Sequence, residues 1–175
     1  VDGVLVGGAS LKAEEFIQII EGRVRDADEL HHRLEQWERD LMPGAIGYLG
    51  STAGCTSTGD CCLIARFESK AAAMRNSARP EQTAWWTETA TCFTGPITFH
   101  DTEEVHVMTH GDLDRARFVQ VMEGKVTDPS RARALNGESD EPLATYRPDL
   151  LGSLTAYFDA DGFAYTSVFI ESVVA

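Results

Sequence analysis

The sequence contains little basic charge and no long apolar run, and both absences narrow the classes of function. Its 175 residues carry 15 Lys and Arg against 28 Asp and Glu, so the formal net charge is −13. Phosphate and anionic membrane surfaces attract clustered basic residues, so we expect neither a nucleic acid nor a membrane as partner. No apolar run approaches the ~20 residues of a spanning helix, and no basic-then-apolar signal peptide opens the sequence. A cytoplasmic protein is therefore expected.

The sequence also lacks the common motifs of cofactor and metal sites. It has no P-loop, no GxGxxG pattern and no Ser-His-Asp grouping. Cys61 and Cys62 are adjacent, and no second cysteine pair stands at the spacing that a tetrahedral zinc site needs. We therefore expect no cofactor and no metal ion.

Two cysteines flank a short polar turn. With a two-residue loop at Thr58 and Gly59, Cys55 and Cys62 would lie opposite each other across a hairpin, which would permit a disulfide. The alternative that we favour is a pair of reduced, small side chains packed in a cytosolic strand pair.

An internal repeat is the clearest feature of the chain. Residues 16–24 (FIQIIEGRV) return 102 positions later as residues 118–126 (FVQVMEGKV), with five of nine positions identical. Each copy places β-branched residues on one side, which is typical of a strand with two distinct faces. Each copy is followed by an aspartate, Asp26 or Asp128, placed to cap a helix. Two copies of one structural unit are therefore predicted.

The first copy has the element order strand–helix–strand–strand–helix–strand. Its first helix is expected to carry one apolar stripe that includes Leu30, Leu34 and Trp37. The elements that we expect are strand 16–24, helix 27–42, a hairpin of strands 45–56 and 61–68, a helical stretch 69–92 broken at Pro80, and strand 97–108.

That order is the ferredoxin-like split βαβ arrangement. We therefore predict an α+β fold with tandem ferredoxin-like units forming a pseudo-dimeric α+β barrel, in which each unit covers the bare sheet face of the other. The expected division is a leader at 1–14, a first unit at 15–110 and a second, truncated unit at 111–175. Exposed sheet edges would allow the protein to form a homo-oligomer.

The repeat and one helical stretch resemble the tandem form of the antibiotic-biosynthesis-monooxygenase group of dimeric α+β barrel proteins. The resemblance rests on strand 16–24 with its copy, and on residues 76–82 (NSARPEQ) leading to Trp85 and Trp86. That wider family includes cofactor-free quinone-forming monooxygenases, haem-degrading enzymes and small-molecule isomerases. In the haem-degrading members a histidine ligand on this helical stretch and an asparagine on the first strand accompany a tryptophan. This sequence has no His between 69 and 96 and carries Gln18 on the strand, so iron ligation is not implied.

A second, shorter resemblance covers the first dozen residues. Residues 1–12 (VDGVLVGGASLK) are similar to the last strand and helix start of triosephosphate isomerase, where paired glycines face a substrate phosphate. Nothing else in the chain matches the other seven βα units, and one strand cannot close a barrel. We expect a leader or a chimeric join; as an alternative, residues 3–8 could add to the incomplete second sheet as an edge strand.

Five residues are candidates for a pocket in the first unit. Trp85, Trp86 and Gln18 are predicted to bind a substrate, and His100 and Asn76 to act in catalysis. Adjacent helical residues diverge by about 100°, so we expect one tryptophan in the core and the other against the pocket.

The three polar candidates each have a structural alternative. Gln18 recurs as Gln120, so it forms either a pocket floor or a hydrogen bond at the seam between the copies. His100 suits acid–base chemistry because its pKa can lie near neutrality, but a partnered structural histidine is the alternative. Asn76 is either a pocket amide or a helix C-terminal cap.

The resemblance and these residues together predict a function. We expect the protein to bind a small apolar or aromatic molecule, with cofactor-independent monooxygenation of an aromatic or quinone-like substrate as its activity. That chemistry needs a desolvated pocket and a proton acceptor. The competing predictions are a non-catalytic stress-response or interaction module, and an inactive fragment derived from triosephosphate isomerase.

Overall fold

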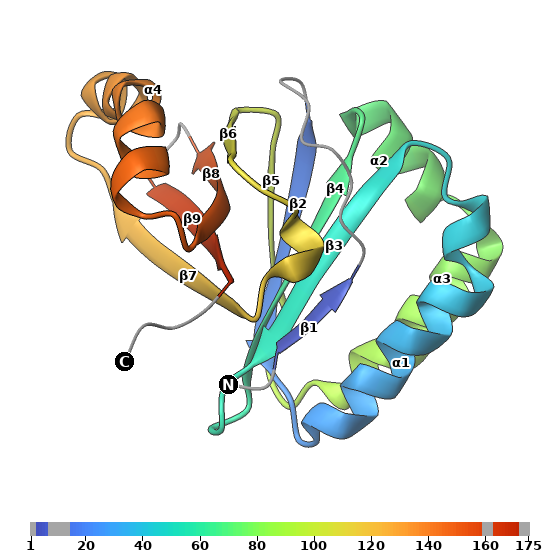
Figure 1. Ribbon diagram of the computed structural model, residues 1–175. Helices are drawn as coiled ribbons and strands as arrows, with labels where there is room; N and C mark the ends of the chain where they lie inside the picture. Colours follow the sequence, from blue (N-terminus) through green and yellow to red (C-terminus); the bar gives the residue numbers. More distant parts are fainter. Residues whose placement is uncertain (1–2, 7–14, 159–162, 172–175) are drawn as a thin grey trace. The chain divides into compact units, whose positions relative to one another are not determined.

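The computed structural model describes residues 3–6, 15–158 and 163–171. The chain divides into two compact units, and the sequence passes from the first to the second between Asp101 and Thr102. Each unit contains one β-sheet and its own helices (Figure 1), which confirms the predicted α+β class with two ferredoxin-like units.

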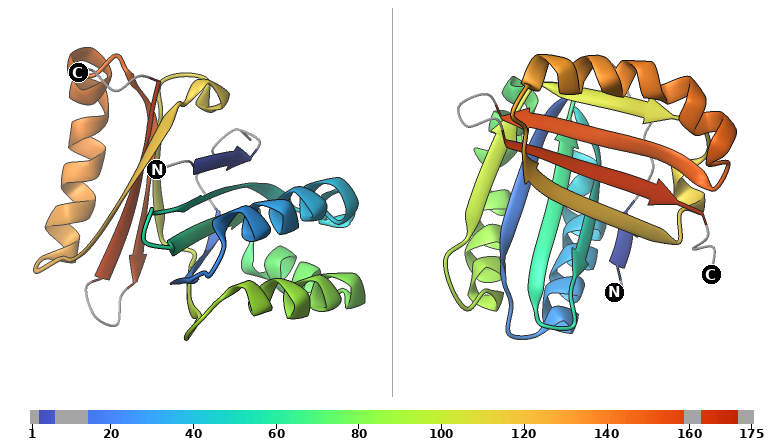
Figure 2. Two further views of the ribbon diagram at one scale, coloured as in Figure 1. Left: turned by 90° about the horizontal axis from the view of Figure 1, so that it is seen from below. Right: turned by 90° about the vertical axis from the view of Figure 1, so that its left-hand side faces the viewer.

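The sheet of the first unit has the strand order β1-β3-β4-β2-β5. Helices α1 and α3 lie side by side on one face of this sheet, as both views in Figure 2 and the labels of Figure 1 show. The strands are β1 (Gly3–Val6), β2 (Phe16–Arg23), β3 (Tyr48–Cys55), β4 (Asp60–Phe67) and β5 (Thr98–Thr102), and the helices are α1 (Ala27–Asp40), α2 (Lys70–Ser77) and α3 (Pro80–Thr89).

Local sequence signals explain where the helices begin. The Asp26 side chain caps α1 by accepting hydrogen bonds from the backbone N–H groups of Asp28 and Glu29. Pro80 opens α3, where its missing N–H leaves no helical hydrogen bond unmade. Leu30 and Trp37 form the buried side of α1, as the apolar stripe predicts.

The hairpin between β3 and β4 differs from the prediction by one residue in register. Cys55 lies opposite Cys61, and these two form a disulfide, whereas Cys62 is a free thiol. Within the loop 56–59, the Thr56 N–H donates to the Asp60 carbonyl, so three residues, 57–59, make the turn, and Gly59 takes the left-handed position at φ +87°. The predicted two-residue loop and the Cys55–Cys62 pairing are therefore wrong, as is the preference for reduced thiols at this hairpin.

Strand β1 is an edge strand of the first sheet. It pairs antiparallel with β3, with Val4 opposite Ala53, and not with the second sheet. The strands of a triosephosphate isomerase barrel are all parallel. The structure therefore does not support the resemblance of residues 1–12 to that enzyme, and the phosphate-binding glycines of that comparison, Gly7 and Gly8, lie outside the described residues.

The second unit has a four-stranded sheet with the order β6-β8-β9-β7. The described part of this unit has no counterpart of α2, α3 or β5, so β7 stands at the sheet edge. Its main elements are β6 (Val105–Thr109), β7 (Phe118–Lys125), α4 (Pro129–Tyr146), β8 (Leu150–Phe158) and β9 (Phe163–Ile170).

The two sheets repeat each other in detail. Phe16 opens β2 opposite Phe67, and Phe118 opens β7 opposite Ile170, so the nine-residue echo does mark equivalent strands. Strand β6 pairs antiparallel with β8 in the way that β1 pairs with β3. The predicted strand 97–108 is therefore two strands in two different sheets, and the boundary between the units falls earlier than residue 110.

Helix α4 has no fully buried residue, and it contacts its sheet through the partly buried Leu143 and through polar groups. His106 Nε2 lies 3.1 Å from Asp140 Oδ1, and Asn136 Nδ2 donates to the Tyr157 hydroxyl at 2.6 Å. Arg133 lies over the Tyr157 ring, 5.0 Å from its centroid. None of the helices in the described part of the chain has both the length and the apolar character needed to cross a membrane.

The hairpin disulfide is expected to stabilise the first unit by about 2 kcal/mol, because it closes a loop with a sequence separation of only 6 residues. All three tryptophans belong to the first unit, so their fluorescence follows the unfolding of that unit in urea. Reductant should lower the urea midpoint of the native protein and should leave Cys55→Ser unchanged. Cys62→Ser is the matched control and should keep the reductant effect. Four free thiols in the unreduced, denatured protein would contradict the disulfide.

Candidate functional site

A cavity of about 250 Å³, the aromatic cavity, lies between the sheet and the helices of the first unit. Strands β2, β3 and β4 form one wall, and α1, α2 and α3 form the other. Four of the five candidates from the sequence line it: Gln18, Asn76, Trp85 and Trp86. The fold thus brings together residues from a strand and from two helices that follow it at a distance in the chain.

Indole and phenyl rings make up the helical side of this cavity. Trp85 lies between Trp37 and Trp86, at centroid distances of 6.3 and 6.1 Å. Trp86 in turn meets the Phe99 ring edge-to-face at 5.5 Å, so a continuous row of rings borders the space. Such tilted and edge-to-face pairs are favourable arrangements for aromatic rings.

The two adjacent tryptophans divide their roles as the helical angle between them predicts. Trp85 packs in the core with Trp37 and Leu41, and its indole N–H donates to the Arg33 backbone carbonyl at 2.9 Å. Trp86 is half-buried and packs against the sheet side of the cavity through Phe99. Both rings nevertheless border the aromatic cavity.

Three side-chain amides also border the cavity, and the chemistry of their partners fixes their orientation. Gln18 Nε2 donates to Asp101 Oδ1 at 3.1 Å, and Asn76 Oδ1 accepts from Arg79 Nη1 at 2.9 Å. A carboxylate can only accept and a guanidinium can only donate, so neither amide can be flipped. Gln82 Oε1 accepts from the Trp37 indole N–H at 2.6 Å, and an indole also only donates.

The remaining end of each amide has no partner among the residues that the structure describes. Gln18 keeps its Oε1 as an acceptor, while Asn76 and Gln82 keep their NH₂ groups as donors. Asn76 is also the most buried of the three, with 6% of its surface exposed. The cavity therefore offers one acceptor and two donors in an aromatic setting.

Asn76 does not cap its helix. It is the last but one residue of α2, and Ala78 occupies the C-cap position. The Asn76 side chain instead binds Arg79, whose Nη1 also donates to the Leu41 carbonyl at 3.0 Å. The pocket alternative therefore describes its position and the cap alternative is wrong.

His100 lies on the opposite face of the sheet from the aromatic cavity. Its neighbour Phe99 contacts Trp86 on the helical face, and successive strand residues point to opposite faces. On the other face, His100 Nε2 lies 3.5 Å from Glu21 Oε2. The expectation that His100 lines the same pocket as the tryptophans is therefore wrong, because the strand places it behind the pocket wall.

No Asp, Glu, His, Lys or Arg side chain is among the described residues that line the cavity. Its one ionisable group is the Tyr48 hydroxyl, which donates to Ser51 Oγ at 2.7 Å. Burial raises the pKa of Tyr48 to about 12, so this phenol stays protonated at neutral pH. The carboxylate hydrogen-bonded to a lining residue is that of Asp101, through Gln18.

Several residues that define the cavity are not among those that the sequence predicts. Asp101 is not among the candidates from the sequence, but it lies in β5 on the face that carries Phe99. Trp37 was read only as part of the apolar stripe of α1, and Gln82 only as part of a family motif. A glutamine that satisfies a buried indole is visible only once α1 and α3 are known to be neighbours.

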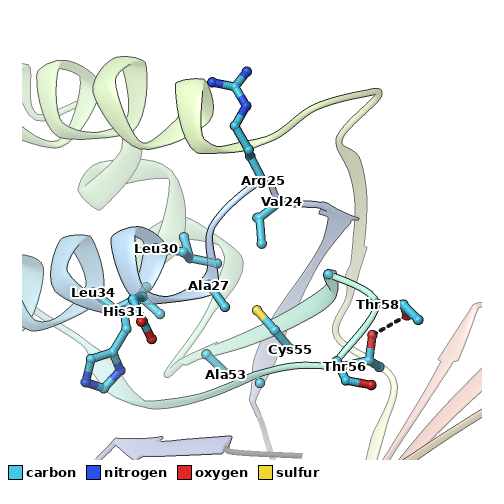
Figure 3. A pocket seen from close by; sticks show the side chains of 14 residues that line it. Val24, Arg25, Ala27, Leu30, His31, Leu34, Ala53, Cys55, Thr56 and Thr58 are labelled. Atoms are coloured by element: carbon cyan, nitrogen blue, oxygen red, sulfur yellow. Dashed lines mark hydrogen bonds between the residues drawn. The ribbon is translucent and has the colours of Figure 1, made fainter.

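A second cavity of about 670 Å³, the outer cleft, opens between the start of α1 and the β3–β4 hairpin (Figure 3). Its apolar floor contains Leu30, Ala53 and Cys55, and Figure 3 shows Arg25 directed away from these side chains. Leu34 and Ala53 line both the outer cleft and the aromatic cavity, so the two spaces adjoin at these residues.

Replacing Gln82 with Leu is expected to destabilise the first unit by about 1–3 kcal/mol, because the buried Trp37 indole N–H loses its acceptor. Tryptophan fluorescence during urea unfolding measures this change. Gln82→Glu keeps an acceptor oxygen and should unfold close to the native protein. Equal stabilities for Gln82→Leu and the native chain would show that the indole is satisfied in another way.

Comparison with known proteins identifies the fold. No protein-family model and no curated protein matches the sequence. Among solved structures, a candidate monooxygenase from Lactobacillus acidophilus has a TM-score of 0.73 and 16% identity, over 91% of this chain and 78% of its own. A candidate monooxygenase from Fusobacterium nucleatum gives 0.70 and 9% over 93% and 78%. An anthrone oxidase-like protein gives 0.63 and 12% over 95% and 76%.

These identities are low, so the likeness establishes the fold and not the reaction. In each case it extends over both units of this chain, as a tandem protein requires. The chain therefore shares the fold of these solved proteins, with two ferredoxin-like units in tandem.

Proposed function

We propose that the first unit binds a small, flat, uncharged aromatic or quinone-like molecule in the aromatic cavity. The observation that carries this proposal is the set of three amides, each fixed at one end and available at the other, in a space bordered by tryptophan rings. A ligand pocket is mostly apolar with a few placed polar groups, and this cavity has that composition.

The three free amide ends determine which substituents the aromatic ring of a ligand must carry. A phenolic hydroxyl can donate to Gln18 Oε1, and a ring carbonyl can accept from the NH₂ groups of Asn76 or Gln82. Stacking or edge-to-face contact with Trp85 and Trp86 adds about 0.5–1.5 kcal/mol per ring pair beyond burial. A hydroxylated ring with a carbonyl satisfies all of these groups at once.

The activity that we propose is oxygenation without a cofactor. The substrate loses a proton, and its carbanion reacts with molecular oxygen, so that one oxygen atom enters the ring as a carbonyl and the other leaves as water. Within this proposal Asp101 accepts a proton through Gln18: Oε1 takes the substrate proton as Nε2 gives its own to Asp101 Oδ1, and the reverse transfer restores the amide and supplies the proton for the leaving water. A desolvated cavity removes the hydration shell of the carbanion and so makes it more reactive toward oxygen.

A second candidate function is binding without turnover, as in a non-catalytic stress-response or interaction module. The observation that favours it is the lack of any charged side chain among the described residues that line the cavity. General acid–base catalysis needs a group within hydrogen-bond reach of the substrate, and Asp101 acts only through Gln18. Ligand binding and oxygen uptake therefore have to be measured separately.

Two further expectations stay predictions. Cytoplasmic location is in tension with the Cys55–Cys61 disulfide, because disulfides are rare in reducing compartments. Homo-oligomers are expected to form through β7, which is an edge strand of the second sheet within the described residues.

Binding of 1-naphthol and of dihydroxyanthracenone is expected to quench the tryptophan fluorescence, since Trp85 and Trp86 border the cavity. Asn76→Leu and Gln18→Leu should each weaken binding about five- to thirtyfold, the equivalent of one hydrogen bond of about 1–2 kcal/mol. Unquenched fluorescence at millimolar ligand would exclude the aromatic cavity as a binding site.

Asp101→Asn separates binding from turnover. Asparagine keeps an acceptor for Gln18 Nε2 but cannot take a proton, so binding should be unchanged while oxygen uptake with the dihydroxyanthracenone falls at least tenfold. His100→Gln is the matched control on the other sheet face and should leave both quantities unchanged. Loss of uptake in His100→Gln with retention in Asp101→Asn would instead support the histidine. No uptake by the native protein would leave binding without turnover as the function.

A further inference from the structure

The aromatic cavity is small for a complete ligand site. Its volume of about 250 Å³ lies just below the roughly 300–1,000 Å³ typical of ligand pockets. The outer cleft, at about 670 Å³, lies within that range but has no aromatic wall. Neither space alone combines the size and the chemistry of a usual site.

Two residues line both the aromatic cavity and the outer cleft. Leu34 on α1 and Ala53 on β3 border both of them. Ala53 is buried, and the half-buried Leu34 packs against the core cluster that contains Ala53, so a molecule that occupies both spaces has to displace the Leu34 side chain. Both residues belong to the first unit, as does every residue that lines the two spaces.

We propose that the aromatic cavity and the outer cleft form one bipartite site for an aromatic molecule that bears an uncharged, hydroxyl-rich extension the size of a sugar. The ring occupies the aromatic cavity, the linking atoms cross between Leu34 and Ala53, and the extension lies in the outer cleft. This inference rests on the proposed function, because it assumes that the ring binds beside the tryptophans.

The rim of the outer cleft selects an uncharged extension. Arg25 and Asp28 are of opposite sign, and His31 is engaged with Glu35 at 3.1 Å, so the rim offers no surplus of either charge. Its far wall is the hydroxyl-bearing loop of the hairpin, residues 56–59.

That loop is built to stay in place. Thr58 Oγ1 donates to Asp60 Oδ2 at 2.8 Å, and Thr56 Oγ1 accepts from the Asp60 backbone N–H at 3.1 Å. Arg23 donates from two guanidinium nitrogens to the Thr58 carbonyl, and the disulfide ties the two strands directly below the loop. Ser57 makes no hydrogen bond within the described residues, so its hydroxyl is open to a ligand. A fixed wall with an apolar floor and a hydroxyl rim matches a polyol, which has apolar faces and hydroxyl edges.

Three probes test the proposal in the native protein: 1-naphthol, 1-naphthyl β-glucoside and 1-naphthyl phosphate. Binding is followed by tryptophan quenching and by calorimetry. We expect the glucoside to bind at least tenfold more tightly than the naphthol, and the phosphate to show no such gain. A glucoside that binds no better than the naphthol, or more weakly than the phosphate, overturns the bipartite site.

Two variants localise the gain. Ala27→Phe fills the outer cleft from an exposed helix position, so it should remove the glucoside advantage and leave naphthol binding unchanged. Ala53→Leu narrows the shared wall and should act in the same direction, with circular dichroism as the test of folding. An unchanged glucoside advantage in a folded Ala27→Phe variant also overturns the proposal. Failure of the proposed function gives a different result, since the naphthol itself would then not bind.

Discussion

Helices α1 and α3 pack on the first sheet through tryptophan side chains, and the hydrogen bonds of these indoles determine where the aromatic cavity lies. An indole is large and rigid and carries one donor, so it packs well only where that donor finds an acceptor. Trp37 finds Gln82 and Trp85 finds the Arg33 carbonyl, so each helix supplies the acceptor for an indole of the other. This reciprocal arrangement fixes the spacing of the two helices and leaves the sheet-side cavity bordered by rings.

The same arrangement decides the polarity of the cavity. Gln82 gives its oxygen to an indole, Asn76 gives its oxygen to Arg79, and Gln18 gives its NH₂ to Asp101. Each amide is held at one end by another side chain, so its free end is oriented before a ligand arrives. Preorganised groups of this kind bind without the ordering cost that flexible side chains incur.

Much of the fold could be predicted from the sequence, because it depends on periodicity and repetition. The repeat at residues 16–24 and 118–126 identified equivalent strands, and the stripe on α1 identified its buried side. The hairpin register failed because one glycine at positive φ adds a residue to the loop, and that choice depends on the backbone and not on the hydrophobic pattern.

The candidate site was predictable in part. Strand alternation places Phe99 and His100 on opposite faces of β5, but nothing in the sequence says which face meets the helices. Asp101 went unrecognised for the same reason, since its value depends on Gln18 lying on the neighbouring strand. Contacts between distant segments decide such questions, and a single sequence does not record them.

Strands β1 and β6 show that the duplicated unit includes an edge strand ahead of the nine-residue repeat. Each precedes its copy of the nine-residue motif and joins the outer side of the strand that follows the first helix, β3 or β8. The element that was duplicated is therefore longer than the sequence echo and starts one strand upstream of it. A truncation that separates the two units is therefore best placed between β5 and β6. A truncation at the start of β7 would leave β6 attached to the first unit, and the second sheet would lose this edge strand.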